Sequence, residues 1–148
     1  MRLPPKILAL SAAGLLALAG FEGFRQEAYE DTGGVATIGF GSTRDVQMGD
    51  RISVTEGLAR LLGDVREAEA AVDRCVKVPV SQNEYDAFVS FAFNVGGGAF
   101  CGSTLVRKLN IEDYPGACRE LMRWVYDNGR KLPGLVKRRA EEYRMCAG

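Results

Sequence analysis

Hydrophobic and polar positions divide the chain into three kinds of stretch. Residues 7–21 contain no charged side chain at all. Residues 31–43 are rich in glycine and β-branched residues, which is typical of a small hairpin or short sheet. After residue 53, apolar residues recur at helical spacing up to the C-terminus. The pattern therefore predicts an α+β chain that is mainly helical, with one small β element near its start.

Capping signals indicate where the helices begin. The predicted helices follow Ser53, Ser81, Ser103, residues 113–115 and Pro133. In the first two, Glu56 and Glu84 complete an S-x-x-E capping box. The first box predicts one long amphipathic helix that ends near residues 75–78, before Pro79. The second predicts a more apolar helix that is stopped by the glycines at 96–98.

The uncharged segment Ile7–Phe21 allows three interpretations. As a helix it would be about 22 Å long at ~1.5 Å per residue, which is short for a hydrocarbon core of about 30 Å. Arg2 and Lys6 before it, and Ala-Leu-Ala at 17–19, fit a cleavable signal peptide. The same charges fit an uncleaved signal anchor. A buried helix of a soluble domain would also use the leucines that share one helical face.

Composition limits the chemistry. The 148 residues suit one compact domain, and 19 basic against 19 acidic residues give no overall field that favours nucleic acid. The chain has no histidine, which excludes Ser-His-Asp and Cys-His catalysis and the common histidine metal sites. We expect no metal and no cofactor. Acid–base chemistry would then come mainly from carboxylates.

The four cysteines, Cys75, Cys101, Cys118 and Cys146, are widely spaced and contain no CxxC motif, which argues against a zinc knuckle. An even number fits two disulfides in an oxidising compartment. It fits four buried thiols in a reducing compartment equally well.

Glu22 and Asp31 are candidate catalytic carboxylates. Glycoside hydrolysis needs one acid to protonate the leaving oxygen and one carboxylate to activate water or attack carbon. Glu22 ends the apolar segment between two phenylalanines, where partial burial would keep it protonated. Asp31 lies in a turn with exposed backbone N–H groups and should stay ionised. The alternatives without catalysis are that Glu22 is a solvated helix end and that Asp31 is a common turn residue.

The spacing of Glu22, Asp31 and Thr37, within E-x8-D-x5-T-I-G-x-G, resembles the catalytic signature of the phage lysozymes of glycoside hydrolase family 24. Residues 86–110 are similar to the family's central buried helix and the turn after it. Residues 123–142 are similar to its C-terminal helical pair. The resemblance implies a single lysozyme domain over residues 1–148, with a helical C-terminal lobe. Many members carry a histidine where this chain has Ser42, a departure that lies outside the triad.

The resemblance also implies roles for these residues. Glu22 would protonate the glycosidic oxygen, Asp31 would orient or activate water or stabilise the oxocarbenium-like transition state, and Thr37 would help hold that water. The substrate would be the β-1,4 bond after N-acetylmuramic acid in peptidoglycan, cleaved with inversion. Asn94 is expected in the substrate cleft, with a helix C-cap as the alternative. Either Arg138 or Arg139 would approach Glu22.

The apolar N-terminus resembles that of the signal-anchor-release endolysins. These are exported with an uncleaved, weakly hydrophobic anchor and become active when it leaves the bilayer. The resemblance implies tethering to the inner membrane through residues 7–21, facing the periplasm. Release would let residues 1–21 refold onto the domain and give a soluble monomer that binds peptidoglycan and no nucleic acid. The cysteines would then form disulfides, and the fold resemblance favours Cys101–Cys118, leaving Cys75–Cys146.

Three other functions compete with this hypothesis. A lytic transglycosylase cuts the same bond without water and leaves an anhydro product, but it typically relies on one glutamate. A secreted lysozyme would lose its N-terminal segment as a cleaved signal. A membrane-anchored peptidoglycan-binding module would need no catalysis, and the intact triad argues against it.

Overall fold

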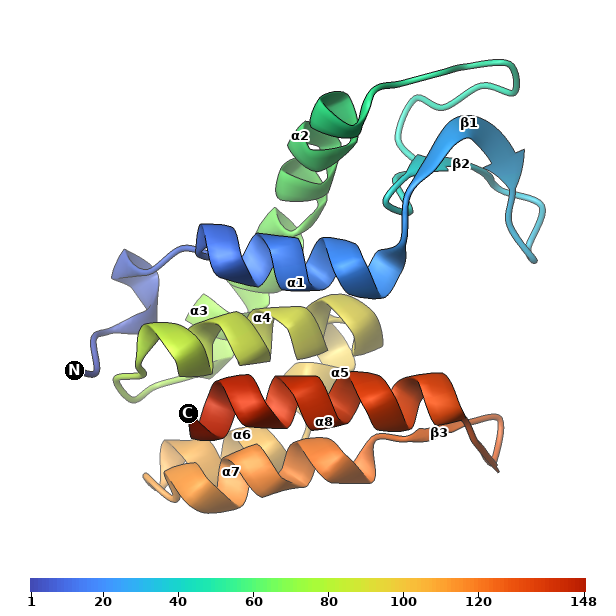
Figure 1. Cartoon of the computed structure of the whole chain (residues 1–148). Coiled ribbons are helices and arrows are strands. Elements are labelled where there is room, and N and C mark those ends of the chain that lie inside the picture. Colours follow the sequence, from blue (N-terminus) through green and yellow to red (C-terminus); the bar gives the residue numbers. More distant parts are fainter. The chain divides into compact units, whose positions relative to one another are not determined.

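A computed structural model describes all residues, 1–148 (Figure 1). The chain divides into two compact units, one of residues 1–14 with 67–148 and one of residues 15–66. Helices dominate, and the strands form two separate two-stranded sheets. The predicted mainly helical α+β class is therefore confirmed.

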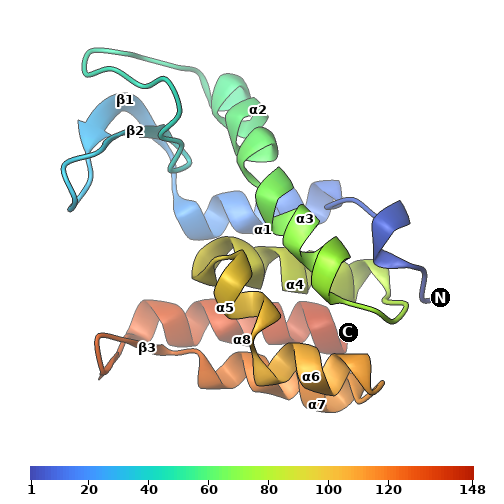
Figure 2. The same ribbon diagram turned by 180° about the vertical axis from the view of Figure 1, so that it is seen from behind.

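The larger unit is built around helix α4. Its elements are η1 (Pro5–Ile7), α3 (Arg66–Cys75), α4 (Gln82–Val95), α5 (Gly97–Cys101), α6 (Thr104–Asn110), α7 (Tyr114–Glu120), η2 (Leu121–Arg123), β3 (Tyr126–Asp127), β4 (Arg130–Lys131) and α8 (Pro133–Ala147). Every residue of α4 from 84 to 92 is buried. Helix α8 packs along α4, and α6 packs against α7, as both views show (Figures 1 and 2). This packing buries the apolar surface that stabilises the unit.

The smaller unit holds a β-hairpin and a helix. Helix α1 (Ala12–Glu22) starts in the larger unit and ends in this one, directly before strand β1 (Arg25–Glu30) (Figure 1). Strand β1 pairs antiparallel with β2 (Ala36–Gly39), and Tyr29 lies opposite Thr37. Helix α2 (Val54–Asp64) packs on β2.

Both predicted capping boxes are present. Ser53 accepts a hydrogen bond from the backbone of Glu56, and Ser81 accepts one from the backbone of Glu84. The single long helix predicted after Ser53 is wrong, because α2 ends at Asp64 and α3 begins at Arg66. Glycine and β-branched residues at 63 and 65 weaken a helix at this point.

The other predicted helix starts are confirmed, but the β element begins earlier than predicted. The first strand precedes residue 31, and residues 31–35 form the turn of the hairpin. The polar sequence of β1, RQEAYE, gives no hydrophobic alternation that could have revealed it. In the N-terminal segment the helix starts only at Ala12, after the 3-10 turn η1. No helix of the structure has both the length and the apolar character needed to cross a bilayer.

All four cysteines are paired, but not as the resemblance suggested. The disulfides are Cys75–Cys101 and Cys118–Cys146, with Cα–Cα distances of 5.5 and 5.6 Å. The expected pairs Cys101–Cys118 and Cys75–Cys146 are wrong, because each cysteine already lies at bonding distance from another partner. Cys75 and Cys101 end α3 and α5, whereas Cys118 and Cys146 lie on the packed helices α7 and α8.

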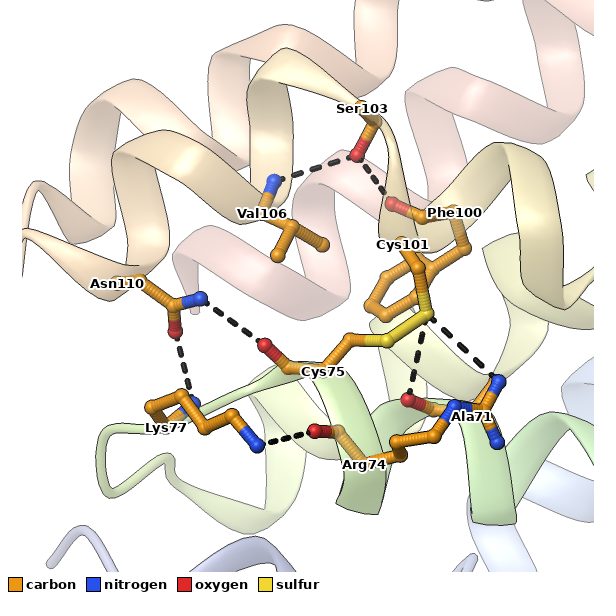
Figure 3. The surroundings of a disulfide bond; sticks show 9 residues. All are labelled: Ala71, Arg74, Cys75, Lys77, Phe100, Cys101, Ser103, Val106 and Asn110. Atoms are coloured by element: carbon orange, nitrogen blue, oxygen red, sulfur yellow. Dashed lines mark hydrogen bonds between the residues drawn. A yellow bond between two sulfur atoms is a disulfide. The ribbon is translucent and has the colours of Figure 1, made fainter.

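The surroundings of the first disulfide tie three segments together (Figure 3). Asn110 at the end of α6 donates a hydrogen bond of 2.9 Å to the carbonyl of Cys75 and accepts one of 2.8 Å from the amide of Lys77. The end of α3 is therefore fixed both covalently and by hydrogen bonds.

Candidate active site

Asp31 lies at the tip of the hairpin, and its carboxylate is held by the turn itself. Its Oδ1 accepts hydrogen bonds from the backbone N–H groups of Gly33 and Val35, at 2.8 and 2.9 Å. The Asp31 amide in turn donates to the carbonyl of Val35 at 3.0 Å. Gly34 has a φ of +78°, a conformation that favours glycine. The turn therefore orients the exposed carboxylate and leaves Oδ2 without a hydrogen bond from the protein.

Thr37 is fixed by the same residue that holds Asp31. It lies on β2 with its side chain buried, and its hydroxyl donates a hydrogen bond of 2.9 Å to the carbonyl of Val35. The N–H of Val35 thus binds the Asp31 carboxylate while its C=O binds the Thr37 hydroxyl. A hydroxyl that donates still has lone pairs that can accept a hydrogen bond from water. The structure brings Asp31 and Thr37 together through their shared partner Val35.

Glu22 is the last residue of α1 and is half-buried. The chain leaves the helix through Gly23, whose φ is +72°. A Cβ added at Gly41 would lie 3.6 Å from Glu22 Oε1, so the carboxylate lies beside the turn that follows β2. Because Thr37 is on β2, this turn connects the surroundings of Glu22 with the strand that carries Thr37. All three residues lie in the unit of residues 15–66.

The turn beside Glu22 is held by hydrogen bonds and by aromatic packing. The backbones of Ile38 and Ser42 exchange two hydrogen bonds of 2.9 Å across it. The Ser42 hydroxyl donates to Asp64 at 2.6 Å. The ring of Phe40 contacts that of Phe24, with centroids 5.1 Å apart. Ser42, the position that departs from the family pattern, is thus a buried packing residue.

Asn94 lies in the larger unit, at the exposed end of α4. It does not cap the helix, because the C-cap is Gly96. Instead its Oδ1 accepts a hydrogen bond from Nη2 of Arg139. This orients the amide so that its NH₂ group faces away from the arginine and can donate elsewhere.

A buried ionic cluster holds the arginine that orients Asn94. Arg139 donates to the Trp124 carbonyl at 2.9 Å and to Glu142 at 2.8 Å. Burial lowers the pKa of Arg139, although the charge of Glu142 opposes this. Glu142 also accepts hydrogen bonds from Ser90 at 2.6 Å and from Arg138 at 3.3 Å. Sequence reasoning missed Ser90 and Glu142, although the three- and four-residue spacing of the arginines from Glu142 was a usable signal.

Comparisons with known proteins add an independent line of evidence. The family model described as "Phage lysozyme" matches residues 19–142. The endolysin of Acyrthosiphon pisum secondary endosymbiont phage 1 is 42% identical over 137 residues, covering 90% of this chain and 94% of that protein. The SAR-endolysin of Bacteriophage PS119 is 34% identical over 152 residues, covering 95% and 91%. A crystal structure of a P22 lysozyme mutant gives a TM-score of 0.90 at 33% identity, covering 96% and 100%.

Proposed function

The chain belongs to the phage lysozyme family, and on that premise we propose that Glu22, Asp31 and Thr37 are its catalytic residues. The protein is a glycosidase, an endolysin with muramidase activity, and its substrate is peptidoglycan. The observation that supports the residue assignment best is the shared attachment of Asp31 and Thr37 to Val35.

In the proposed reaction Glu22 donates a proton to the glycosidic oxygen as the bond to the sugar breaks. Asp31 accepts a proton from water through its second oxygen, and the Thr37 hydroxyl accepts a hydrogen bond from the same water. The hydroxyl produced attacks the anomeric carbon from the opposite face. Inversion by this route requires a separation of about 6.5–9.5 Å between the two carboxyl groups.

We propose that Asn94 binds substrate through its NH₂ group. The hydrogen bond from Arg139 occupies Oδ1 and so fixes which end of the amide is available. A preoriented donor loses little conformational entropy when it binds a sugar oxygen. Replacement by aspartate would remove the donor and place a negative charge beside the substrate.

We further propose that residues 7–21 tether the protein to the inner membrane after export, facing the periplasm, and that release gives a soluble monomer. Residues 1–148 would then act as one lysozyme domain onto which residues 1–21 refold. Two observations support this proposal. Relatives are named SAR-endolysins, and the family model matches residues 19–142, which include parts of both units. Cleavage after Ala19 would remove most of α1, which ends at Glu22, and so disfavours the secreted alternative.

The test is hydrolysis of purified peptidoglycan by the full-length protein and by Glu22→Gln. Loss of a general acid lowers the rate by roughly 10²–10⁴-fold, so we expect Glu22→Gln to be inactive with an unchanged fold. Glu30→Gln, at an exposed position of the same unit, is the matched control and should remain active. Mass analysis should show reducing products with one added water. Anhydro products would indicate the transglycosylase, and an active Glu22→Gln would contradict the assignment.

A further inference from the structure

Helix α1, which ends at Glu22, begins where side chains of α3 and α4 bind the backbone that precedes it. The amide of Leu10 donates to Glu69 Oε2 at 2.8 Å, and the amide of Ser11 donates to Asp86 Oδ1 at 3.0 Å. The Ser11 hydroxyl donates to Asp86 Oδ2. The side-chain amide of Gln82 donates through Nε2 to the backbone carbonyl of Ala9 at 2.8 Å. Three consecutive residues are therefore held by the body of the larger unit.

These contacts cap the N-terminus of α1. The first N–H groups of a helix have no partner within it, and a negative charge near them is stabilising. Ser11 accepts a hydrogen bond of 3.0 Å from the amide of Gly14. Because the Ser11 hydroxyl donates its hydrogen bond to Asp86, its lone pairs can accept the hydrogen bond from Gly14. Asp86 is itself buried and is held by Gln82 at 2.9 Å.

The short length of α1 makes it marginal as an isolated helix, although alanine and leucine favour helix formation. It has 11 residues, no charged residue before Glu22 and no acid in its first turn. Isolated helices shorter than about 12–15 residues are marginal in water. The side chain of Leu16 is 62% exposed, so burial does not hold every turn of the helix.

We propose that Asp86 is a positioning residue that starts α1 at Ala12 and so sets the place of Glu22. The proposal rests on the proposed role of Glu22 as the general acid. Glu69 and Gln82 assist Asp86 by holding Leu10 and Ala9.

A second attachment holds the residues that precede η1 on the same unit. Arg2 donates to both carboxylate oxygens of Glu84, at 3.0 and 2.9 Å, and its guanidinium lies 3.6 Å from the ring centroid of Tyr114. Leu3 and Val80 exchange two backbone hydrogen bonds of 2.8 Å.

Two glycines of the same helix provide a matched test. Alanine is a better helix former than glycine, so helix propensity alone predicts that either substitution favours α1. A Cβ at Gly14 would lie 2.8 Å from Asp86 Cγ and 2.7 Å from Leu10 Cδ1, whereas nothing lies within 4 Å of a Cβ at Gly20. We expect Gly14→Ala to lower kcat on purified peptidoglycan by about tenfold, by misplacing Glu22. Gly20→Ala should keep the wild-type kcat.

Substitutions at Ser11 and Asp86 distinguish an effect on the position of Glu22 from an effect on the stability of the fold. Ser11→Ala and Asp86→Asn should lower kcat with little change in KM, and Ser11→Thr should restore kcat because it keeps the hydroxyl. Glu67→Gln, an exposed position on α3, is the control. Equal kcat for Gly14→Ala and Gly20→Ala, or a lower Tm with unchanged kcat at Ser11 and Asp86, would overturn the proposal. An active Glu22→Gln would instead contradict the general-acid role of Glu22. The results for Glu22 and for Asp86 therefore test the two proposals separately.

Discussion

The hairpin that carries Asp31 and Thr37 and the helix that carries Glu22 are held in place in different ways. The Asp31 carboxylate binds amides two and four residues further along the chain. The start of α1 binds carboxylates that are 59 and 75 residues away in sequence. The first arrangement can form from local contacts alone, whereas the second requires the larger unit to be folded and the N-terminal segment to be free to reach it.

The two halves of the proposed reaction are therefore carried by two elements, one held by local contacts and one held by contacts with the larger unit. The residues proposed to hold water, Asp31 and Thr37, belong to the hairpin, which has local contacts. The proposed acid, Glu22, belongs to the helix whose start depends on distant contacts. Hydrolysis requires both protonation of the leaving oxygen and attack by water. Displacing only the acid is therefore enough to keep a tethered lysozyme inactive.

Asp31→Asn should have the largest effect. The amide Oδ1 can still accept from Gly33 and Val35, so the turn should persist, but the side chain can no longer take a proton from water. We expect activity on peptidoglycan to fall by about 10²–10⁴-fold, with unchanged amide exchange in the hairpin. Thr37→Val, which removes a hydroxyl but no charge, should reduce activity less. Wild-type activity of Asp31→Asn would show that the turn carboxylate is not catalytic.

Removal of the Cys75–Cys101 disulfide should affect α1 more than the hairpin. This bond fixes the end of α3, the helix that carries Glu69. Replacing both cysteines by alanine should lower the free energy of unfolding by about 3 kcal/mol, as for other loops of this size. The measurement is chemical denaturation combined with amide exchange.

The Cys118–Cys146 disulfide is the matched comparison, because its sequence separation of 28 is close to the 26 of the first. Its removal should lower stability similarly but should not loosen the end of α3. Equal exchange of α1 amides in the two double variants would contradict a specific link between α3 and α1.

The smallest expected effect is the pH dependence of the stability that the Arg2–Glu84 pair contributes. Burial acts to raise the pKa of Glu84, but hydrogen bonds from Arg2 and from Ser81 outweigh it, so the pKa lies below its ordinary value. A lowered pKa in the folded state means that this carboxylate stabilises the protein fully above its unfolded pKa of about 4.3. The contribution is lost as the pH falls through the lower, folded-state value.

Thermal unfolding of the wild type and Glu84→Gln between pH 7 and pH 3 measures this contribution. The wild type should have the higher Tm at neutral pH, and the difference should shrink as the pH falls below the ordinary pKa. Because Arg2 is 46% exposed, salt should also reduce the difference. A Tm difference that grows on acidification would contradict the sign of the argument.

Local signals predicted much of the fold. The capping boxes at Ser53 and Ser81 identified two helix starts. The spacing of Glu22, Asp31 and Thr37 predicts catalytic roles, which stay predictions. What failed depended on tertiary context. The polar strand β1 shows no alternation, and the disulfide partners depend on which helices pack together.

The contacts at the start of α1 were also outside the reach of sequence reasoning. Asp86 looks like an ordinary polar residue near the start of a buried helix, and Ser11 looks like one polar position in an apolar segment. Only the fold brings the two together, and no local pattern records that one caps the helix through the other.

The most direct test of the difference between hairpin and helix is amide hydrogen exchange of the full-length protein and of Asp86→Asn. We expect faster exchange for the amides of residues 12–20 in the variant, with the hairpin of residues 25–39 and helix α4 protected as in the wild type. Unchanged protection of residues 12–20 would contradict the proposed role of Asp86, because α1 would then form without the Asp86–Ser11 cap.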